Sequence, residues 1–432
     1  MNQTPPPTTR NPWSWIPTLY FGQGLPYVVV MTVAVIMYKR FGLSNTDIAL
    51  YTSWLYLPWV IKPFWSPFVD ILKTKRWWIV TMQLIIGAGL AGVAFTLPTP
   101  FYFQASLGFF WLLAFSSATH DIAADGFYML ALDDSQQSFF VGIRSTFYRL
   151  AMITGQGLLI ILAGYLETRT GSTPQAWKIT FLVLAGLFLI LFLYHNYILP
   201  RPIADQGKTT LTPTEILHEF RHTFVSFFTK KGIGLAIAFM LLYRLAEAML
   251  VKLATPFLLD VREVGGLGLS TQEVGVVFGT VGIIALTLGG IIGGIVASQK
   301  GLKYWLWPMA LSITLPNAAY LLLSFFQPEN FLWINAAVAI EQFGYGFGFT
   351  AYVLFLIYFS DGEHKTAYYS ICTGFMALGM MIPGMISGWL QEMLGYNQFF
   401  IFIMIATIPT LLLIPFLKID PEFGKKSKKR NK

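Results

Sequence analysis

Apolar runs long enough to cross a lipid bilayer recur along the whole chain, and they constrain its fold more than any other feature. A spanning helix needs about 20 mostly apolar residues, and runs of this kind alternate here with short polar breaks. They lie at 15–38, 46–69, 77–97, 103–132, 138–166, 177–199, 233–259, 273–297, 303–326, 331–359, 366–391 and 397–417. The sequence therefore predicts an all-α membrane protein with twelve transmembrane helices.

The composition agrees with a membrane protein and excludes several other classes. Of 432 residues, 55% are hydrophobic and 12% are charged, roughly half the charged fraction of an average soluble protein. The single cysteine, Cys372, cannot form an intrachain disulfide. Six of the positive charges behind the net charge of +8 lie in Lys425–Lys432. Such a basic tail is typical of a cytoplasmic, lipid-facing flank, so no nucleic-acid partner is expected.

The basic residues of the short loops predict the orientation in the membrane. They are concentrated after the second, sixth and eighth runs, as Lys73, Lys75, Arg76, Arg201, Lys208, Arg221, Lys230, Lys231, Lys300 and Lys303. Cytoplasmic loops carry an excess of Lys and Arg, so both termini are expected in the cytoplasm. The Pro-rich start, Met1–Pro7, lacks the features of a cleaved signal and is expected to stay on the protein.

The longest polar break divides the chain into two halves of six runs. A weak repeat aligns the segment from Gly155 with that from Gly379 at a constant offset of 224 residues. The predicted domains are 1–14, a cytoplasmic segment; 15–199 and 232–417, the two six-helix halves; 200–231, a cytoplasmic linker; and 418–432, a basic cytoplasmic tail. The linker has a capping box at Thr212–Glu215 and then an amphipathic pattern, which indicates a helix on the membrane surface.

Enzyme signatures are weak. His218 and His222 fit the H-E-x-x-H pattern of zinc proteases, so a membrane metalloprotease is a remote alternative. The motif lies in the polar linker, and the nearest distal acid, Asp260, precedes Val261 instead of glycine. We therefore expect a solvated helix face and neither metal nor cofactor. The glycine-rich stretch 289–294 lies inside an apolar run, which predicts close helix packing instead of a nucleotide loop.

Charged residues inside the apolar runs are the candidate functional groups. They are Asp121, Asp125, Arg144, Arg149, Arg244, Glu247 and Glu341. A carboxylate in mid-membrane costs about 2.5–3.5 kcal/mol on insertion scales. Asp121 and Asp125 lie one helical turn apart on one face, so at least one is expected to be protonated. We expect Asp125 to carry a proton, followed by Asp121 and Glu247. The alternative is a permanent salt bridge that fixes helix register.

Several motifs resemble those of the AmpG-like muropeptide permeases, in the peptide, acetyl-coenzyme A and drug transporter branch of the major facilitator superfamily. Tyr20–Pro26 resembles the family's F-x-x-G-L-P, and Lys62–Asp70 resembles K-x-x-W-x-P-x-x-D. Similar matches occur at Ser117–Asp125, Tyr148–Met152, Leu242–Ala248, Glu273–Val277 and Ile340–Phe343. The resemblance implies the major facilitator fold, with twelve helices in two pseudo-symmetric halves and a substrate site near mid-membrane between them.

The same resemblance implies function. It implies a monomeric, proton-coupled importer of cell-wall-derived anhydro-muropeptides in the bacterial inner membrane, with no enzymatic activity. His120, Arg244 and Glu247 replace the family's glutamine, lysine and aspartate, which leaves open a different cargo such as acetyl-coenzyme A, a peptide or a drug. A phosphorylated cargo would need more basic residues than the three arginines of the set.

The remaining candidates divide into two groups. Those expected to bind substrate or pair charges are Arg144, Arg149, Arg244, Glu341, Gln342, His120, Gln23 and Tyr148. Those expected to act in gating are Asp70, Lys73, Arg76, Lys62, Gly24 and Pro26. Asp70 and the following bases resemble the superfamily's cytoplasmic loop motif. Gly24 and Pro26 interrupt regular helix hydrogen bonding and suit a flexing helix.

Overall fold

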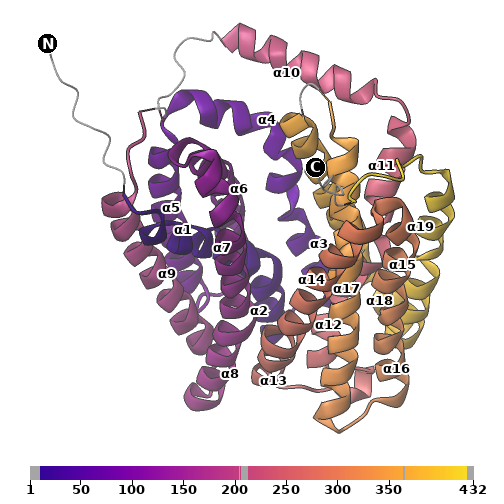
Figure 1. The fold of residues 1–432 in the computed structure, drawn as a ribbon. Helices are drawn as coiled ribbons and strands as arrows, with labels where there is room; N and C mark the ends of the chain where they lie inside the picture. Colours follow the sequence, from indigo (N-terminus) through magenta and orange to yellow (C-terminus); the bar gives the residue numbers. More distant parts are fainter. Residues whose placement is uncertain (1–9, 204, 206–212, 363–364, 426–432) are drawn as a thin grey trace, which may run out of the picture. The chain divides into compact units, whose positions relative to one another are not determined.

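The computed structural model describes residues 10–203, 205, 213–362 and 365–425. These residues form helices and no strands, as Figure 1 shows. The chain groups into two compact units. Unit 1 comprises Met1–Phe41 and Ile61–His218, and unit 2 comprises Gly42–Val60 and Glu219–Lys432. The segment Gly42–Val60 thus belongs with unit 2, although it lies within the predicted first half. The domain boundaries drawn from the sequence stay a prediction.

Unit 1 is built from long helices around one apolar core. Its elements are η1 Pro12–Ser14, α1 Ile16–Val28, η2 Val29–Val33, α2 Ala34–Arg40, most of α4 Leu57–Leu72, α5 Lys75–Thr96, α6 Tyr102–Ala131, α7 Asp134–Ile153, η3 Thr154–Leu158, α8 Leu159–Thr170 and α9 Thr173–Ile198. Trp15 and Phe127 are fully buried and meet edge to face, with ring centroids 5.3 Å apart. This contact joins the start of α1 to α6.

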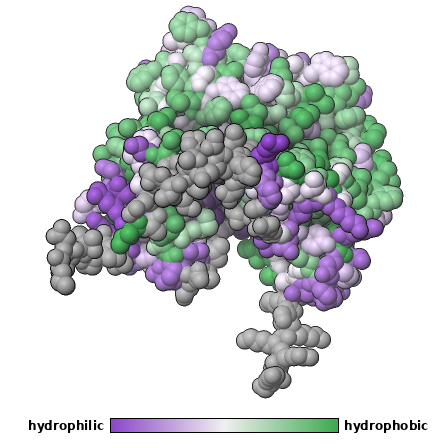
Figure 2. All heavy atoms as spheres, turned by 90° about the horizontal axis from the view of Figure 1, so that it is seen from above, coloured by the Kyte–Doolittle hydropathy of each residue, from purple (hydrophilic) through white to green (hydrophobic). Residues whose placement is uncertain are grey.

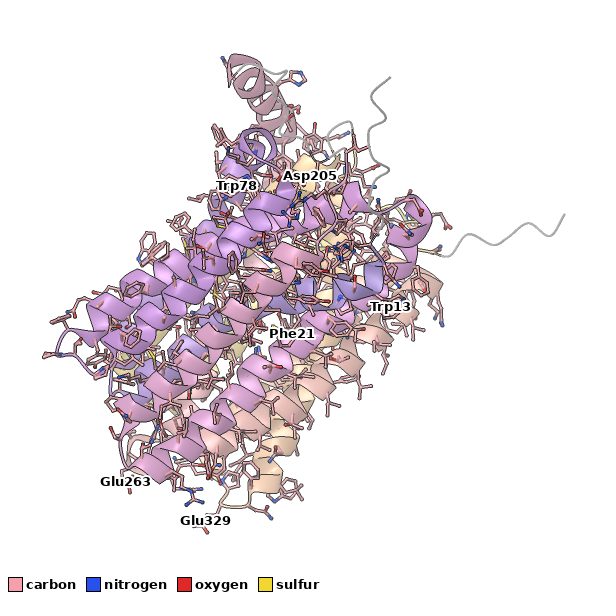
Figure 3. The ribbon with its side chains drawn as sticks, turned by 90° about the vertical axis from the view of Figure 1, so that its left-hand side faces the viewer. Trp13, Phe21, Trp78, Asp205, Glu263 and Glu329 are labelled. Atoms are coloured by element: carbon pink, nitrogen blue, oxygen red, sulfur yellow. The ribbon has the colours of Figure 1, made fainter. Side chains whose placement is uncertain are left out.

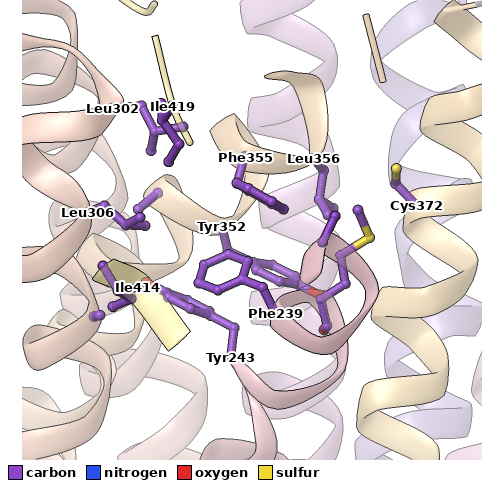
Figure 4. Packing of buried hydrophobic residues seen from close by; sticks show 14 of the residues in the cluster. Phe239, Tyr243, Leu302, Leu306, Tyr352, Phe355, Leu356, Cys372, Ile414 and Ile419 are labelled. Carbon is purple, nitrogen blue, oxygen red and sulfur yellow. The ribbon is translucent and has the colours of Figure 1, made fainter. Parts of the chain in front are cut away.

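Unit 2 holds the other helices. They are α3 Asn45–Trp54, the end of α10 Pro213–Phe228, α11 Ile233–Leu242, α12 Leu245–Leu259, η4 Arg262–Val264, α13 Thr271–Val276, η5 Val277–Gly282, α14 Ile283–Lys300, α15 Leu302–Thr314, η6 Leu315–Asn317, α16 Ala318–Phe326, α17 Phe331–Phe359, α18 Lys365–Ile405, α19 Ile408–Leu413 and η7 Ile414–Phe416. In its core, shown in Figure 4, the rings of Tyr243 and Tyr352 stack with centroids 5.1 Å apart.

The predicted spans correspond closely to these helices. Nine described stretches are long and apolar enough to cross a membrane. The final stretch, Ala367–Phe416, contains the last two predicted spans, and α18 changes direction within it at Gly395, whose φ is +76°. The predicted spans 46–69 and 103–132 are not among the nine. The first breaks at residues 55–56 between α3 and α4, and the second forms the single long helix α6.

Local sequence explains where several helices begin. The Ser44 hydroxyl accepts a hydrogen bond from the Asp47 N–H at the start of α3. Asp133 and Gln136 form a reciprocal capping box at α7. Both arrangements satisfy N–H groups that have no partner within the helix. The predicted box at Thr212–Glu215 begins outside the described residues, and α10 starts at Pro213.

Glycines let α14 and α17 pack closely, as the stretch 289–294 predicts. A Cβ at Gly289 would overlap the carbonyl oxygen of Phe343, and one at Gly346 would overlap that of Leu286. Small residues at such positions let helix backbones approach each other in a membrane. The expected packing role of the glycine-rich stretch is therefore confirmed.

The exterior is apolar. Figure 2 shows broad hydrophobic areas with separate hydrophilic patches. Phe326 is 77% exposed, Tyr197 is 72% exposed and Leu332 is 69% exposed. Large exposed apolar areas mark contact with lipid or another apolar partner, as expected for membrane-spanning helices.

Candidate functional site

Several of the charged side chains within the spanning helices are paired with one another, in unit 1 and in unit 2. In unit 1, Arg144 Nη2 on α7 lies 3.2 Å from Asp125 Oδ1 on α6. The Tyr20 hydroxyl donates a hydrogen bond of 3.4 Å to the same carboxylate oxygen. The Arg144 guanidinium also lies over the rings of Tyr20 and Tyr128, at 4.6 and 5.0 Å from their centroids. These ring faces attract the cation, so both the carboxylate and the rings hold Arg144 in place.

The two aspartates of α6 interact with different cations. Lys62 Nζ on α4 lies 3.8 Å from Asp121 Oδ2, whereas Asp125 is paired with Arg144. The Asp125 side chain is 42% exposed and that of Asp121 is 15% exposed. Arg149, five residues after Arg144, forms no ion pair with any described residue. The two aspartates thus pair with different cations, and the Asp125 side chain is the more exposed of the two.

The cluster in unit 2 centres on Arg244, which lies at the break between α11 and α12. Its Nε is 2.8 Å from Glu247 Oε2, and its Nη2 is 3.1 Å from Glu247 Oε1. The same Nη2 donates to the Tyr345 hydroxyl at 2.9 Å. Both charged residues are buried. A two-point pair of this kind is a strong charge-assisted contact.

Glu341 and Gln342 lie on the neighbouring helix α17. Gln342 Nε2 donates to Glu341 Oε2 at 2.9 Å. Glu341 is 2% exposed, and among the described residues no cation lies within ion-pair distance of it. The structure thus brings Glu341 next to its sequence neighbour but not into a charge pair.

His120 belongs to a buried hydrogen-bonded chain in unit 1 instead of the aspartate cluster. Gln83 on α5 lies between His120 on α6 and His195 on α9, with contacts of 3.1 and 2.9 Å. Thr18 on α1 continues the chain to His195 at 2.9 Å. Because the amide nitrogen of Gln83 can only donate, His120 Nε2 must accept, and the His120 proton lies on Nδ1. That Nδ1 atom is buried without a hydrogen-bond partner.

Sequence reasoning missed Gln83, His195 and Thr18. A signal was present, because Gln83 is a polar side chain in the middle of the apolar run 77–97. A single polar residue of this kind indicates that a partner exists but not which helix supplies it. The chain ties four helices together, since α1, α5, α6 and α9 each contribute one side chain.

The other candidates of the first helix have different surroundings. Gln23 is buried, and its Oε1 has no hydrogen-bond partner. Gly24 allows α1 to approach α7 closely, because a Cβ there would lie 3.1 Å from the Tyr148 ring and 3.0 Å from Ala151. Pro26 precedes the wide helical turn η2, Val29–Val33. Proline removes a backbone donor, and such π-type turns often occur at functional sites.

Three of the candidate gating residues, Asp70, Lys73 and Arg76, lie where α4 ends and α5 begins. The side chain of Asp70 is outside the described residues. Arg76 donates to the carbonyl oxygens of Leu199 at 3.3 Å and of Asn196, which ties α5 to the end of α9. Lys73 lies over the Trp77 ring at 6.0 Å. Lys62 lies earlier in α4 and pairs with Asp121 instead of lying beside Lys73 and Arg76.

Asp205 is a residue that the sequence analysis did not select. Its carboxylate accepts from the backbone N–H groups of Lys75 and Arg76, at 2.7 and 3.0 Å. An acidic group at a helix N-terminus is stabilised by the helix dipole and by these unpaired donors. Figure 3 shows Asp205 near Trp78 at the same end of unit 1. Asp205 thus holds the linker against the start of α5.

Lys252 is a second charged residue that was missed. It lies in the apolar run 233–259, is 3% exposed, and donates through Nζ to Thr52 Oγ1 at 3.0 Å. The ammonium also lies over the Tyr56 ring, 5.2 Å from its centroid. Lys252 therefore joins α12 to α3 within unit 2.

A polar cluster joins the start of α3 to the same unit. Asn45 Nδ2 donates to Gln391 Oε1 at 2.7 Å and to the Tyr396 hydroxyl at 3.0 Å. The Tyr396 hydroxyl donates to Asp260 at 2.6 Å, and the Thr46 N–H donates to Glu392 at 3.0 Å.

Figure 3 shows Glu263 and Glu329, from two loops of unit 2, at the same end of its helices.

The zinc-protease pattern is only partly visible. The His218 side chain is outside the described residues. Among the side chains that the structure does describe, no group of three or more His, Cys, Asp or Glu residues could hold a metal ion.

Comparisons with known proteins give a consistent result. The profile of the Major Facilitator Superfamily matches residues 18–361. The AmpG 4 protein of Rickettsia conorii is 27% identical over 409 residues, covering 91% of this chain and 93% of the relative. The anhydromuropeptide permease of Escherichia coli K12 is 26% identical over 409 residues, covering 92% of this chain and 77% of the relative.

Solved structures show the same fold at lower sequence identity. The nucleoside transporter NupG matches with a TM-score of 0.70 and 16% identity, covering 94% of this chain and 99% of the other. A POT family transporter crystallised with 5-aminolevulinic acid matches with a TM-score of 0.70 and 13% identity, covering 93% and 95%. At such identities the likeness concerns the fold alone.

Proposed function

Because the chain belongs to the Major Facilitator Superfamily, we propose that it is a proton-coupled importer of anhydro-muropeptides in the bacterial inner membrane. The proposed cargo comes from its likeness to the Escherichia coli anhydromuropeptide permease over 92% of this chain. The observation that carries the coupling is the Asp125–Arg144 pair, an ion pair between α6 and α7 whose carboxylate is partly exposed. A membrane-embedded acid of this kind marks a proton or substrate pathway in many transporters.

Protonation of Asp125 is the proposed switch. A neutral Asp125 no longer attracts Arg144, so the guanidinium is released from its electrostatic partner and is held only by the faces of Tyr20 and Tyr128. A proton shifts a conformational equilibrium only if it binds the two states differently. The loss of this ion pair supplies such a difference. Asp121, paired with Lys62 at 3.8 Å, is the second candidate in the same helix.

Glu247 has surroundings that favour the alternative role of a permanent pair. Two hydrogen bonds link it to Arg244, and both side chains are buried. Removing one partner from such a pair leaves an uncompensated charge and costs about 3–5 kcal/mol. We propose that Arg244 and Glu247 fix the break between α11 and α12 and present Tyr345 and Phe349 beside a cation.

The cation and ring surfaces suit a sugar-peptide cargo. Carboxylates of a peptide stem can bind guanidinium groups in a two-point geometry, and sugar C–H faces can stack on aromatic rings. A phosphorylated cargo such as acetyl-coenzyme A would need more positive charge than Arg144, Arg149 and Arg244 supply, and two of these three arginines are paired with carboxylates. We propose that the protein acts as a monomer with both termini in the cytoplasm, as the basic loops predict.

Uptake of labelled anhydro-muropeptide into proteoliposomes tests this function. The expected result is saturable accumulation under an imposed proton gradient, which a protonophore abolishes. Unlabelled acetyl-coenzyme A and free peptides should compete poorly. Absence of saturable uptake would refute the cargo, and saturable uptake that ignores the gradient would refute the coupling.

A further inference from the structure

We propose that Glu341 holds a proton in this conformation and is a second proton-binding group of the transport cycle. Its part in transport rests on the proton coupling proposed above, whereas its protonation is a property of the protein that can be measured alone. The inference starts from Glu341's position as a deeply buried carboxyl group without a cation.

Glu341 lies well inside a spanning helix. It is ten residues from the start of α17, Phe331–Phe359, and eighteen from its end, and it is 2% exposed. Its described hydrogen bond comes from Gln342, a neutral amide. An isolated carboxylate in a medium of low dielectric constant is so costly that the group takes up a proton instead. Glu341 can remain charged only if a nearby cation compensates it.

Glu341 interacts electrostatically with Glu247, and Glu247 is already paired with a cation, Arg244. Two Arg244 nitrogens bind the two oxygens of Glu247, and one of them also binds Tyr345. Glu341 is near enough to Glu247 for the two carboxyl groups to interact electrostatically. A charged Glu341 would therefore add a second negative charge near Glu247, whose own charge Arg244 already compensates. With Glu341 neutral, the three side chains have no net charge.

Among the residues that the structure describes, the helices packed against α17 supply no other compensating charge. Gly282, just before α14, lies beside Gln342. Lys300, at the other end of α14, is about 27 Å further along the helix axis and is therefore too far away to compensate Glu341. Lys303 is near the start of α15, whereas Ser312 near its end is level with Gly344. Elements η5, η6 and α11 have no titratable side chains.

The titratable groups of α16 and α18 do not supply a positive charge to Glu341 either. Tyr320 on α16 interacts electrostatically with Glu341 and is neutral in its ordinary form. On α18, Tyr368 and Cys372 belong to the apolar core of unit 2, Glu392 binds Thr46, and Tyr396 binds Asp260. Lys365, at the start of α18, lies beside Asp361.

Buried polar atoms without hydrogen-bond partners lie near α17. The Tyr320 hydroxyl and both polar atoms of the Asn317 side chain are buried without hydrogen-bond partners. Asn317 follows Pro316, which a Cβ at Gly344 would meet at 2.6 Å. Buried polar groups without protein partners commonly bind ordered water. A hydrated conformation would let Glu341 lose its proton, so its release would accompany a structural change.

Infrared difference spectroscopy on the full-length protein in liposomes tests the protonation directly. At neutral pH the wild type should show a C=O stretch of a neutral carboxylic acid that disappears in Glu341→Gln. The matched control is Glu263→Gln, at an exposed loop position, which should keep the band. Glutamine mimics the protonated side chain in shape, so Glu341→Gln should melt at the wild-type temperature. A spectrum unchanged by Glu341→Gln overturns the proposal.

Transport provides the second readout and separates the two proposals. Glu341→Gln should lose accumulation driven by a pH gradient, and Glu263→Gln should keep it. If wild-type uptake ignores the gradient, the proposed coupling is wrong, while the infrared band still decides whether Glu341 holds a proton. If the wild type responds to the gradient and Glu341→Gln responds equally, the transport role of Glu341 is wrong.

Discussion

Arg144 Nη2 lies 3.2 Å from Asp125 Oδ1, and the same guanidinium covers the rings of Tyr20 and Tyr128. Asp125→Asn keeps the shape of the side chain but cannot carry the negative charge. We expect it to abolish the dependence of uptake on the pH gradient while the protein still folds, because the aromatic rings continue to hold Arg144. Uptake into proteoliposomes with and without the gradient measures this. Loss of folded protein on purification would instead support a permanent salt bridge.

Lys252 tests how much free energy of unfolding is lost when a lysine is buried beside a hydroxyl group instead of a carboxylate. Lys252→Met keeps an unbranched side chain of similar length and removes the charge. We expect the free energy of unfolding to rise by about 1 kcal/mol or more. Thr52 stays hydrogen-bonded, since its hydroxyl also donates to the Ile48 carbonyl oxygen at 2.6 Å. A shift of the melting temperature in detergent measures the effect. Lys231→Met, at an exposed site, is the control, and destabilisation by Lys252→Met would contradict the prediction.

The buried chain through Gln83 should stabilise unit 1. Gln83→Leu deprives His120 and His195 of their shared partner. Leaving buried polar groups unsatisfied costs about 1–3 kcal/mol each, so the melting temperature should fall by several degrees. Gln398→Leu, at an exposed position, should leave it unchanged. An unaltered melting temperature in Gln83→Leu would show that water replaces the amide.

Packing of α3 on α18 can be tested through thiol accessibility. Gly388 lies against the Asn45 backbone, where a Cβ would overlap the carbonyl oxygen. Gly388→Val should therefore displace α3 from α18. A cysteine at the buried position Ser53, made by Ser53→Cys, should be protected from a maleimide in the wild-type background and react when Gly388→Val is added. Cys372 is buried and serves as the internal reference. Equal protection in both backgrounds would refute this packing.

Lys230 gives a pH-dependent prediction outside the spanning segments. Its Nζ donates to the carbonyl oxygens of Phe359 and Asp361, at 2.5 and 2.7 Å. Burial lowers the pKa of Lys230, so in the alkaline range the unfolded chain binds this proton more tightly than the folded chain. Stability therefore rises with pH between the folded and the unfolded pKa. The melting temperature of the wild type should increase relative to Lys230→Met across that window, and a falling difference would contradict this.

The sequence was sufficient to predict the fold class and the family. The major facilitator fold is confirmed by the family profile over residues 18–361, and the resemblance to AmpG-like permeases by relatives that match 91% and 92% of the chain. Helices are predictable here because each span must satisfy its own backbone hydrogen bonds. The relatives, named transporters and permeases, also confirm a transporter and not an enzyme.

Side-chain partners were harder to predict. Both Arg144 and Arg149 on α7 were candidates to pair with an aspartate of α6. In the structure Arg144 pairs with Asp125, and the sequence does not show which face of α7 lies against α6. His120 precedes Asp121 in sequence but turns toward Gln83, because neighbouring residues on a helix face different directions. Lys252 was passed over, although a lysine within an apolar run was visible. Its partner Thr52 lies 200 residues away, beyond any local pattern.

The assignment of Gly42–Val60 to unit 2 has a consequence for the chain's connectivity. The backbone crosses between the units three times, at residues 41–42, 60–61 and 218–219. The first crossing leads into Gly42, whose φ is +81° and whose Cα faces open space. Helix α3 belongs to unit 2, but the chain on both sides of the segment Gly42–Val60 belongs to unit 1. The crossing at residues 60–61 falls inside helix α4, Leu57–Leu72, so this one helix carries residues of both units.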